Sequence, residues 1–557
     1  MLKISPLQRL RAQYTPKIPS ALHSAWQLAI EANADKREED EMIAQMFPHT
    51  FGKGKVSFSE GNEGRNKSDK PIRVGVILSG GQAPGGHNVI AGLYDGIKQL
   101  HTDSQLYGFL MGPDGLINHN YIEITRELVD HYRNTGGFDM IGSGRTKLEQ
   151  KEQFDAGLLI LKRLDISALV IVGGDDSNTN AAILAEYYQS INAGIQIIGC
   201  PKTIDGDLKG KDIECSFGFD TATKLYAELI GNVQRDCVSA KKYWHFIKLM
   251  GRTASHITLE CALKCQPNVT IISEEVKANN WRITDLVDYI SAIIAKRAER
   301  GLMYGTVLVP EGILEFLPSF RRLIDELNDC LSNAELSYLN EKEQDERLSL
   351  VASLLSQDNA ALLLSLPRYV ALQLLEDRDP HGNVQVSKIE TEALLVELVE
   401  RKLKTMAEEG RFHGKFAALT HFFGYEGRCS FPSNFDADYC YSLGRTSVAL
   451  IFEGLTGYMA IVSNTTHPAN ECIAGGVPLT RLMHLERRAG TFKPVIRKSL
   501  VDLKGEPFAY FSKHREQWAK DDCYIYTGPL AFYGPREICD EPTLTLRLEI
   551  DGSPSFN

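Results

Sequence analysis

Two glycine-containing segments, each just after a short apolar run, carry residues of the types that can bind phosphate. Residues 80–86 (GGQAPGG) follow the run RVGVIL. A turn of this kind exposes backbone N–H groups at a helix N-terminus, where they attract anions. Residues 173–178 (GGDDSN) follow ALVIV, and a carboxylate such as Asp175 can there reach a Mg²⁺ ion that keeps several of its waters. Taken singly, each segment is also explained as a structural turn or a helix cap.

Segment Pro201–Asp207 (PKTIDGD) carries a candidate general base. Residues two apart face the same side of an extended stretch, so Thr203, Asp205 and Asp207 would line one wall. Lys202 would lie opposite. An aspartate is ionised at neutral pH and can accept a hydroxyl proton while a phosphoryl group is transferred. An Asx-rich turn explains the same segment without any catalytic role.

Three arginines that follow glycines add to this set, namely Arg145, Arg252 and Arg428. A planar guanidinium matches the geometry of phosphate, although a lone arginine is equally explained by a surface ion pair. Pro310-Glu311-Gly312 is likewise explained as a plain turn. The ordered occurrence of an anion loop, a metal carboxylate, a candidate base and arginines is nevertheless typical of phosphoryl transfer, which depends on positioning and charge neutralisation.

The elements that must position these residues are strands alternating with helices. This alternation predicts an α/β fold with a mostly parallel sheet. Ligands of such sheets bind at the carboxyl ends of the strands, which is where the segments above lie. The expected strands are 73–78, 168–172, 194–199, 246–250 and 305–309, and the expected helices include 87–100 and 178–189.

The remaining regions have a different character. Residues 1–52 are polar and helical in part, and 53–70, rich in glycine, serine and charge, are predicted to be a linker or exposed loop. Long amphipathic stretches predict a helical insertion over about 313–410. Further strands are expected around 416–419 and 449–452, and in the alternating segment 543–550 (TLTLRLEI).

The composition excludes several classes of protein. With 61 basic and 72 acidic residues the formal net charge is −11, which argues against a general nucleic-acid binder. The 11 cysteines are scattered without a C-x-x-C pair, which predicts reduced thiols. The sequence has neither a secretory signal nor an apolar run long enough to span a bilayer, so we expect a soluble, cytoplasmic protein with no membrane partner.

Together these segments resemble the phosphofructokinase family, in particular its long pyrophosphate-dependent form in plants, spirochaetes and chlamydiae. The resemblance runs from about Ile72 to Arg445 and depends above all on PKTIDGDL (201–208) with GGDDSN. It implies two Rossmann-like three-layer α/β/α domains with the active site between them, a helical insertion and terminal extensions. It also implies reversible, Mg²⁺-dependent phosphoryl transfer to the 1-hydroxyl of fructose 6-phosphate.

The domain boundaries that follow from the resemblance divide the chain into four parts. They are an extension and linker at 1–70, a domain for pyrophosphate and Mg²⁺ at 71–216 with about 427–485, a domain for fructose 6-phosphate at 217–426 containing the helical insertion, and an extension at 486–557.

Two positions decide the phosphoryl donor in this family. Relatives that use ATP have glycine where this chain has Asp176, and usually also where it has Lys202. The Asp176 carboxylate would occupy the space of the ATP α-phosphate and repel its charge. The Lys202 ammonium would hold the shorter pyrophosphate. The resemblance further implies that the backbone N–H of Gly81 and the side chain of Arg145 contact pyrophosphate.

The resemblance also assigns the catalytic roles. Asp205 would take the proton of the sugar hydroxyl, with Thr203 beside it. Arg252 would stabilise the transferring phosphoryl group, and Asp175 would hold Mg²⁺. Lys202 and Asp176 complete this catalytic set.

The sugar-phosphate site would be shared between subunits. Lys242 and Tyr243 would reach the 6-phosphate from a neighbouring chain, which implies a homodimer or a larger assembly. The remaining sugar-binding residues implied by the resemblance are Thr203, Asp205, Met250, Gly251, Arg252, Glu311, Tyr425, Glu426, Gly427 and Arg428.

Three alternatives stay open at this point. An ATP-dependent phosphofructokinase would have glycine at positions 176 and 202. A non-catalytic regulatory subunit would bind sugar phosphates without turnover, but the intact Asp205 argues against it. A nicotinamide-dependent oxidoreductase would carry G-x-G-x-x-G and a following acidic residue in the proper context, which the chain lacks.

Overall fold

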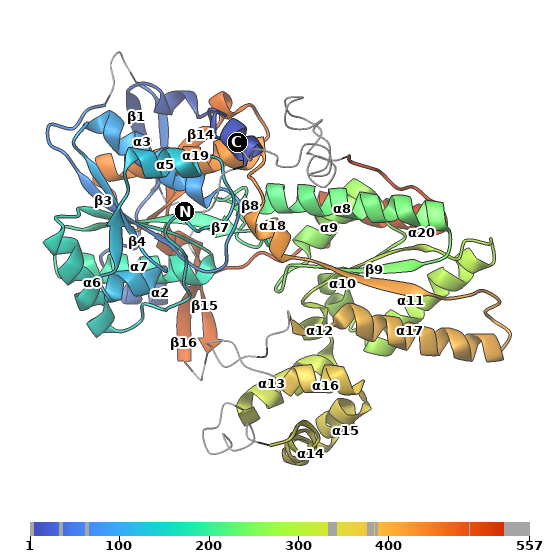
Figure 1. The fold of residues 1–557 in the computed structure, drawn as a ribbon. Coiled ribbons are helices and arrows are strands. Elements are labelled where there is room, and N and C mark those ends of the chain that lie inside the picture. Colours follow the sequence, from blue (N-terminus) through green and yellow to red (C-terminus); the bar gives the residue numbers. More distant parts are fainter. Residues whose placement is uncertain are drawn as a thin grey trace, which may run out of the picture. The chain divides into compact units, whose positions relative to one another are not determined.

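The structure of the chain is a computed structural model that describes residues 5–32, 37–61, 66–331, 342–375, 384, 388–488 and 491–528. These residues form two compact units (Figure 1). As far as the described residues go, unit 1 consists of Met1–Ala222 and Glu426–Ser499. Unit 2 consists of Thr223–Tyr425 and Leu500–Gly528.

Unit 1 is built on a sheet in which the described residues form ten strands. Its order is β1-β2-β14-β13-β7-β6-β3-β4-β5, and β8 pairs with the end of β7. The five central strands, from β13 to β4, are parallel, whereas the pairs at both edges are antiparallel. The strands are β1 (Trp26–Glu31), β2 (Lys55–Glu60), β3 (Arg73–Leu78), β4 (Gln105–Phe109), β5 (Tyr121–Glu123), β6 (Ala168–Gly173), β7 (Gln196–Thr203), β8 (Phe217–Gly218), β13 (Tyr458–Ser463) and β14 (Ile473–Pro478).

Helices cover both faces of this sheet. In Figure 1, α3 (Gly86–Leu100) and α19 (Asn434–Phe452) lie on one face, and α6 (Lys151–Arg163) and α7 (Asp175–Ser190) on the other. Strands buried on both faces read as unbroken apolar runs, which is why β6 is apolar throughout. The other elements of unit 1 are α1 (Pro6–Ala12), η1 (Ser20–Leu22), α2 (Asp40–Met46), α4 (Pro113–Ile117), α5 (Arg126–Tyr132), η4 (Ala469–Glu471), η5 (Leu479–Leu482), and the hairpin of β15 (Met483–Arg488) and β16 (Thr491–Ile496).

The direction of the chain reverses at β3 and β6. The chain leaves β3 for β4 on one side and leaves β6 for β7 on the other. The carboxyl ends of two such strands diverge and leave a crevice in which open α/β sheets bind their ligands. The glycine-rich segment 80–86 and the segment 173–178 are the two turns at this point.

Unit 2 contains a smaller sheet, for which the described residues give the order β10-β11-β9-β12 with all strands parallel. Helix α8 (Phe219–Ala240) begins in unit 1 and continues in unit 2. The strands are β9 (Trp244–Leu249), β10 (Val269–Thr270), β11 (Gly305–Pro310) and β12 (Ala418–Phe423), and the other helices near the sheet are α9 (His256–Cys265), α10 (Ser273–Ala278), α11 (Ile283–Ala298), α17 (Thr391–Glu408) and α20 (Glu506–Lys520).

The helical insertion is present, and it packs onto the core of unit 2. Its apolar residues, for example Phe320, Leu363 and Leu374, join one cluster with the strand residues Phe246 and Val307. Its described helices are α12 (Ile313–Phe316), α13 (Pro318–Leu331), α14 (Gln344–Leu354), α15 (Gln357–Ser365), α16 (Arg368–Leu375) and then α17, and α18 (Tyr425–Cys429) follows β12. The expected α/β class with two such units is confirmed.

Two predictions from composition are wrong. Residues 53–70 are not simply a linker, because they include β2, which pairs between β1 and β14 in the sheet and whose Val56 and Phe58 side chains are buried. The alternation of these apolar residues outweighs the surrounding charge and glycine. Residues 449–452 are not a strand but the last turn of α19. Because α19 is buried on nearly all sides, apolar residues occur on every face of it, and the sequence shows no 3.6-residue alternation of apolar and polar residues.

The strand predicted at 194–199 continues past Pro201 to Thr203. At this end of the strand Pro201 pairs with Gly173 of β6, whereas β13 pairs with β7 only at Ile198 and Gly199. The segment 543–550 lies outside the described residues. No described helix is long and apolar enough to cross a membrane, and the ten cysteines within the described part of the chain are all free.

Candidate functional site

The glycine-rich turn after β3 is tied to a second loop that carries Arg145. Gly80 has φ +84°, and its N–H donates to the carbonyl of Gly144 over 2.9 Å. Ser79 pairs with Gly144 as an isolated parallel bridge. Arg145 itself is exposed. The turn and the loop are thus joined backbone to backbone, which brings two expected anion contacts to one edge of unit 1.

Gly81 lies directly against the guanidinium of Arg428, from helix α18. A side chain at position 81 would overlap with Nη1 of Arg428. The turn then enters α3 through Gly85, whose φ of +111° belongs to the left-handed region that glycine accepts most readily. The absence of side chains therefore makes room for an arginine from a segment about 350 residues away in sequence.

Asp175 and Asp176 are the first two residues of helix α7. Carboxylates are stabilised there by the partial positive charge of the helix N-terminus. Asn178 holds the turn in place, because its Nδ2 donates to the carbonyls of Gly173 and Gly174 and to that of Cys200 in β7. The helix starts three residues earlier than the sequence predicts, so both carboxylates are fixed by helical backbone.

The segment after β7 is a turn and not the extended stretch that the sequence predicts. The Thr203 hydroxyl accepts a hydrogen bond from the N–H of Asp205 over 3.1 Å, and Gly206 has φ +71°. Asp205 is half-buried and Asp207 is buried. The hydroxyl of Thr203 thus fixes the backbone of Asp205, and the expected alternation of side chains along one wall is wrong.

Lys202 is the centre of the charged cluster in unit 1. It is a buried lysine near the end of β7. Burial lowers the pKa of its ammonium to about 8, and Arg428 and Arg145 act in the same direction, whereas Asp205 and Asp175 raise it. The structure therefore brings four other sequence-predicted site residues, from four segments of the chain, within electrostatic reach of Lys202.

Lys498, which follows β16, also belongs to this cluster and was missed by the sequence analysis. Its Nζ lies 3.3 Å from Oδ2 of Asp175. Burial raises the pKa of the Asp175 carboxyl, Lys498 opposes the rise, and Asp176 and Asp207 add to it. No local motif marks Lys498, because it lies more than 300 residues beyond Asp175 and outside any glycine-rich turn.

The acidic residues fit a divalent metal that a substrate helps to hold. Within the described part of the chain, no three His, Cys, Asp or Glu side chains form a metal-binding group. Mg²⁺ commonly takes only one or two protein carboxylates and completes its shell with phosphate oxygens and waters. Asp175, whose carboxylate already has a cationic partner in Lys498, suits this arrangement.

Unit 2 contains the remaining predicted residues at the ends of its strands. Met250 and Gly251 follow β9, and the N–H of Gly251 donates to Oε2 of Glu311 over 3.0 Å. Glu311, which follows β11, is buried. Arg252 lies beside Glu315, with Nε donating to Oε1 over 3.0 Å. These contacts join the ends of two neighbouring strands and leave Arg252 half-buried.

The residues expected at the sugar phosphate are mostly exposed. The Lys242 ammonium lies over the ring of Tyr243 at 5.0 Å from its centroid. Tyr425 is 66% exposed, and Glu426 is exposed as well, whereas Gly427 is buried. Tyr425 belongs to unit 2 and Glu426 to unit 1. An anion could reach the lysine and tyrosine side chains from solvent.

Comparison with known sequences gives a consistent result. The phosphofructokinase family model matches residues 73–347. A Porphyromonas gingivalis protein named pyrophosphate–fructose 6-phosphate 1-phosphotransferase is 60% identical, over 98% of this chain and 99% of its own length. A protein of the same name from Treponema pallidum is 51% identical, over 98% of this chain and 97% of its own.

Among solved structures, a pyrophosphate-dependent phosphofructokinase from Nitrosospira multiformis is similar in fold. It has a TM-score of 0.53 and 15% sequence identity, and the match covers 82% of this chain and 94% of that one. At this identity the likeness concerns the fold alone.

Proposed function

Since this chain belongs to the phosphofructokinase family, we propose that it transfers a phosphoryl group reversibly between pyrophosphate and the 1-hydroxyl of fructose 6-phosphate. The products are fructose 1,6-bisphosphate and phosphate. The observation that carries the proposal is the identity of 60% and 51%, over nearly the whole length, to enzymes named for this reaction. Asp176 and Lys202, the residues expected of the pyrophosphate-dependent form, are in keeping with it.

Pyrophosphate would bind at the cluster in unit 1. The N–H groups of the glycine-rich turn at Gly81, the ammonium of Lys202 and the guanidinium of Arg145 would contact its oxygens. Asp176, at the second position of α7, would exclude a nucleotide by its charge. Because Lys202 is buried, its charge acts in a poorly screened environment and is worth more than at the surface.

Magnesium is the divalent metal that we propose for this site, with Asp175 as its protein ligand. When bound, it would offset the negative charge of pyrophosphate and so make phosphate a better leaving group. The other groups that would contact pyrophosphate are the protein groups named above, at Gly81, Lys202 and Arg145.

The transfer would proceed by in-line displacement. The 1-hydroxyl oxygen of the sugar attacks one phosphorus of pyrophosphate, the bridging P–O bond breaks, and the proton passes to the Asp205 carboxylate. The hydrogen bond from the Asp205 N–H to the Thr203 hydroxyl, which holds the backbone of Asp205, supports this role. Arg252 would stabilise the charge on the transferring group.

Fructose 6-phosphate would be bound by residues at the strand ends of unit 2 together with the segment Tyr425–Arg428. Met250, Gly251 and Glu311 would line the sugar pocket. We further propose that Lys242 and Tyr243 reach the 6-phosphate of a neighbouring subunit, in a homodimer or larger assembly. A fully active monomer in analytical ultracentrifugation would contradict the shared site.

Initial rates on the purified chain test the proposal. Fructose 6-phosphate and Mg²⁺ are supplied with either pyrophosphate or ATP, and formation of fructose 1,6-bisphosphate is followed. Turnover with pyrophosphate alone is expected. Turnover with ATP alone would overturn the assignment of the donor, and a folded chain without turnover on either would contradict the proposal of a self-sufficient enzyme.

A further inference from the structure

Lys498 reaches the acidic residues at the start of α7 from a segment to which nothing above assigns a function. Its Nζ lies 3.3 Å from Asp175, and its side chain is 37% exposed. Electrostatic attraction from Asp207 and Asp176 adds to this ion pair. The lysine side chain therefore lies as a cation among carboxylates.

The backbone on both sides of Lys498 is fastened to the elements that carry these carboxylates. The N–H of Ile496 donates to Oγ1 of Thr179, one turn after Asp175 in α7, over 3.1 Å. The N–H of Ser499 donates to the carbonyl of Asp207 over 2.6 Å. Lys498 is thus placed by two anchors, one on each acidic segment.

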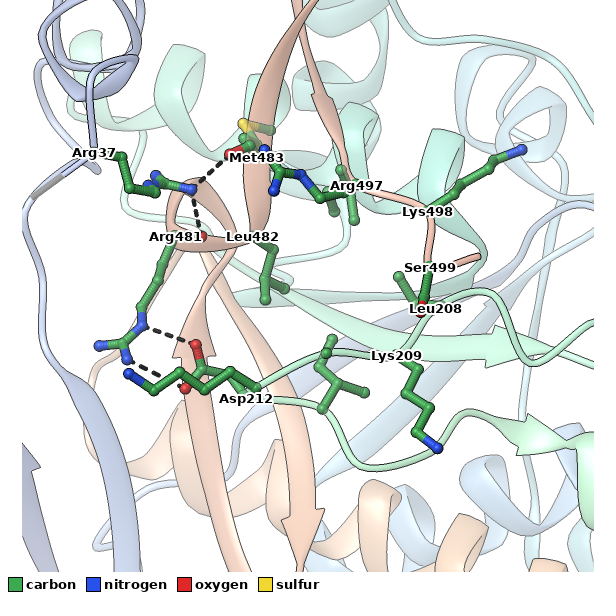
Figure 2. A pocket seen from close by; sticks show the side chains of 14 residues that line it. Arg37, Leu208, Lys209, Asp212, Arg481, Leu482, Met483, Arg497, Lys498 and Ser499 are labelled. Atoms are coloured by element: carbon green, nitrogen blue, oxygen red, sulfur yellow. Dashed lines mark hydrogen bonds and ion pairs between the residues drawn. The ribbon is translucent and has the colours of Figure 1, made fainter. Parts of the chain in front are cut away.

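The neighbouring residue provides a natural contrast. Figure 2 shows that Arg497 and Lys498 leave the backbone in opposite directions. Arg497 is exposed and lines a pocket of about 500 Å³ together with Arg37, Arg481 and Met483. Lys498 lines the same pocket, but its side chain points the other way, and its ammonium is the one that ion-pairs with Asp175.

We propose that Lys498 is a donor-binding residue of the site, pairing with Asp175 before ligands arrive and contacting the pyrophosphate oxygens once that carboxylate engages the divalent metal. This inference rests on the proposed function. An ammonium that pairs with a metal-binding carboxylate keeps the site neutral without the metal, and it is already near the position of the polyanion when the donor binds.

The charges of the cluster favour this role. Asp175, Asp176 and Asp207 act on Lys498, and Arg145, Arg428 and Lys202 are further cations of the cluster. Removing Lys498 takes one positive charge away from this group. A less positive site attracts pyrophosphate less strongly, so the loss should appear in the affinity for the donor.

The test compares Lys498→Met with a control, Arg497→Met. The control removes one positive charge from the same segment, but from a side chain that points away from Asp175. Binding of methylenediphosphonate, a diphosphate that cannot transfer its phosphoryl group, is measured by calorimetry with Mg²⁺ present. We expect affinity for the analogue to fall about 10- to 100-fold in Lys498→Met, as for the loss of one hydrogen bond between charged groups. In Lys498→Met the KM for pyrophosphate should rise in parallel, and the KM for fructose 6-phosphate should not change. In Arg497→Met the affinity for the analogue and both KM values should stay within about twofold of wild type.

Binding of Mn²⁺ without any diphosphate, followed by electron paramagnetic resonance, separates this role from a structural one. Lys498→Met should bind the metal at least as tightly as wild type, because the competing ammonium is gone, whereas a disrupted site would bind both ligands more weakly. Lys498→Arg, which keeps the charge, should retain most of the affinity for the analogue.

Two results would overturn the inference: unchanged affinity of Lys498→Met for the analogue, or equal losses of metal and analogue binding. If wild type itself lacked turnover with pyrophosphate, the proposed function would fail, and that result is distinct from either.

Discussion

Gly81 and Arg428 are in contact such that a side chain on the first would occupy the position of the guanidinium of the second. The contact itself depends on glycine at position 81, because any Cβ there would displace the guanidinium, whereas the φ of Gly81 lies outside the left-handed region. Arg428 also acts on Lys202, whose pKa it helps to lower. The turn after β3 and the charged cluster of unit 1 therefore depend on each other.

Replacing Gly81 by alanine should push Arg428 out of the cluster. The added methyl group meets the guanidinium itself, and an expelled arginine removes one of the cations near the glycine-rich turn. We expect the KM for pyrophosphate to rise about tenfold or more, in line with the loss of one charged hydrogen bond, and the KM for fructose 6-phosphate to rise as well, because Arg428 belongs to the segment proposed to bind that sugar. Steady-state kinetics with each substrate varied in turn measures both values.

Gly210→Ala is the matched control, because among the described residues a Cβ at position 210 meets nothing within 4 Å. It should leave both KM values unchanged. If Gly81→Ala behaved like Gly210→Ala, the contact between the turn and Arg428 would have no part in donor binding.

Asp205→Asn should abolish most of the catalytic rate with little effect on substrate affinity. The amide keeps the size of the side chain but cannot take the hydroxyl proton. General base catalysis contributes about 10²- to 10⁴-fold, so kcat should fall by that order while the KM for fructose 6-phosphate stays within a few-fold. The exposed Asp103 provides a control, Asp103→Asn. A kcat close to wild type in Asp205→Asn would remove Asp205 from the role of base.

The local part of the site could be predicted from the sequence, and the long-range part could not. Asp175 and Asp205 follow strands whose apolar runs are plain in the sequence, Lys202 lies near the end of one of them, and strand ends of one sheet lie together. No such run precedes a predictable turn at Lys498. This residue is brought to the cluster by the hairpin β15–β16 and by two backbone hydrogen bonds beside it, from Ile496 to Thr179 and from Ser499 to Asp207.

The fold shows a similar division. Strands buried on both faces, β3 and β11, have the predicted bounds to within a residue, because each is one apolar run. Strand β2, at the side of the sheet, buries only alternate residues and was predicted as part of a linker. The turn after Thr203 was not predicted either. The Thr203 hydroxyl shapes this turn by accepting a hydrogen bond from the backbone N–H of Asp205, and no pattern of residue types in the sequence indicates such a bond.

The choice of donor should depend on Asp176 and Lys202 together. Nζ of Lys202 lies 3.1 Å from the position of a Cβ on Gly80, so its ammonium directly adjoins the glycine-rich turn. Asp176 is exposed at the start of α7. Removing both side chains, in Asp176→Gly with Lys202→Gly, should permit turnover with ATP and weaken turnover with pyrophosphate, measured as kcat/KM for each donor.

Asp176→Gly alone is the control for that double variant, because it removes the repulsion and keeps the ammonium that holds pyrophosphate. It should keep more of the pyrophosphate reaction than the double variant does. A folded double variant that still shows no turnover with ATP would mean that other residues exclude the nucleotide.

His87, one residue into α3, should make the first part of unit 1 sensitive to acid. Its Nδ1 lies 2.7 Å from the Thr135 hydroxyl, its Nε2 accepts the N–H of Met140 over 3.3 Å, and Asp139 lies 3.7 Å away. Burial lowers the pKa of the imidazole to about 4, against the opposing effects of Asp139 and of the hydrogen bond at Thr135. The folded chain thus keeps this ring neutral at pH values where the unfolded chain protonates it.

The sign of the pH effect follows from the protons bound. Between about pH 6.5 and pH 4 the unfolded state binds one more proton at His87 than the folded state, so the free energy of unfolding falls as the pH falls. From pH 7 to pH 5 this residue should account for about 2 kcal/mol. Amide hydrogen exchange in α3 at the two pH values measures it. His87→Gln should lose less stability on acidification than wild type, and the exposed His413→Gln should lose as much; equal losses in all three proteins would show that His87 is not the group that senses acid.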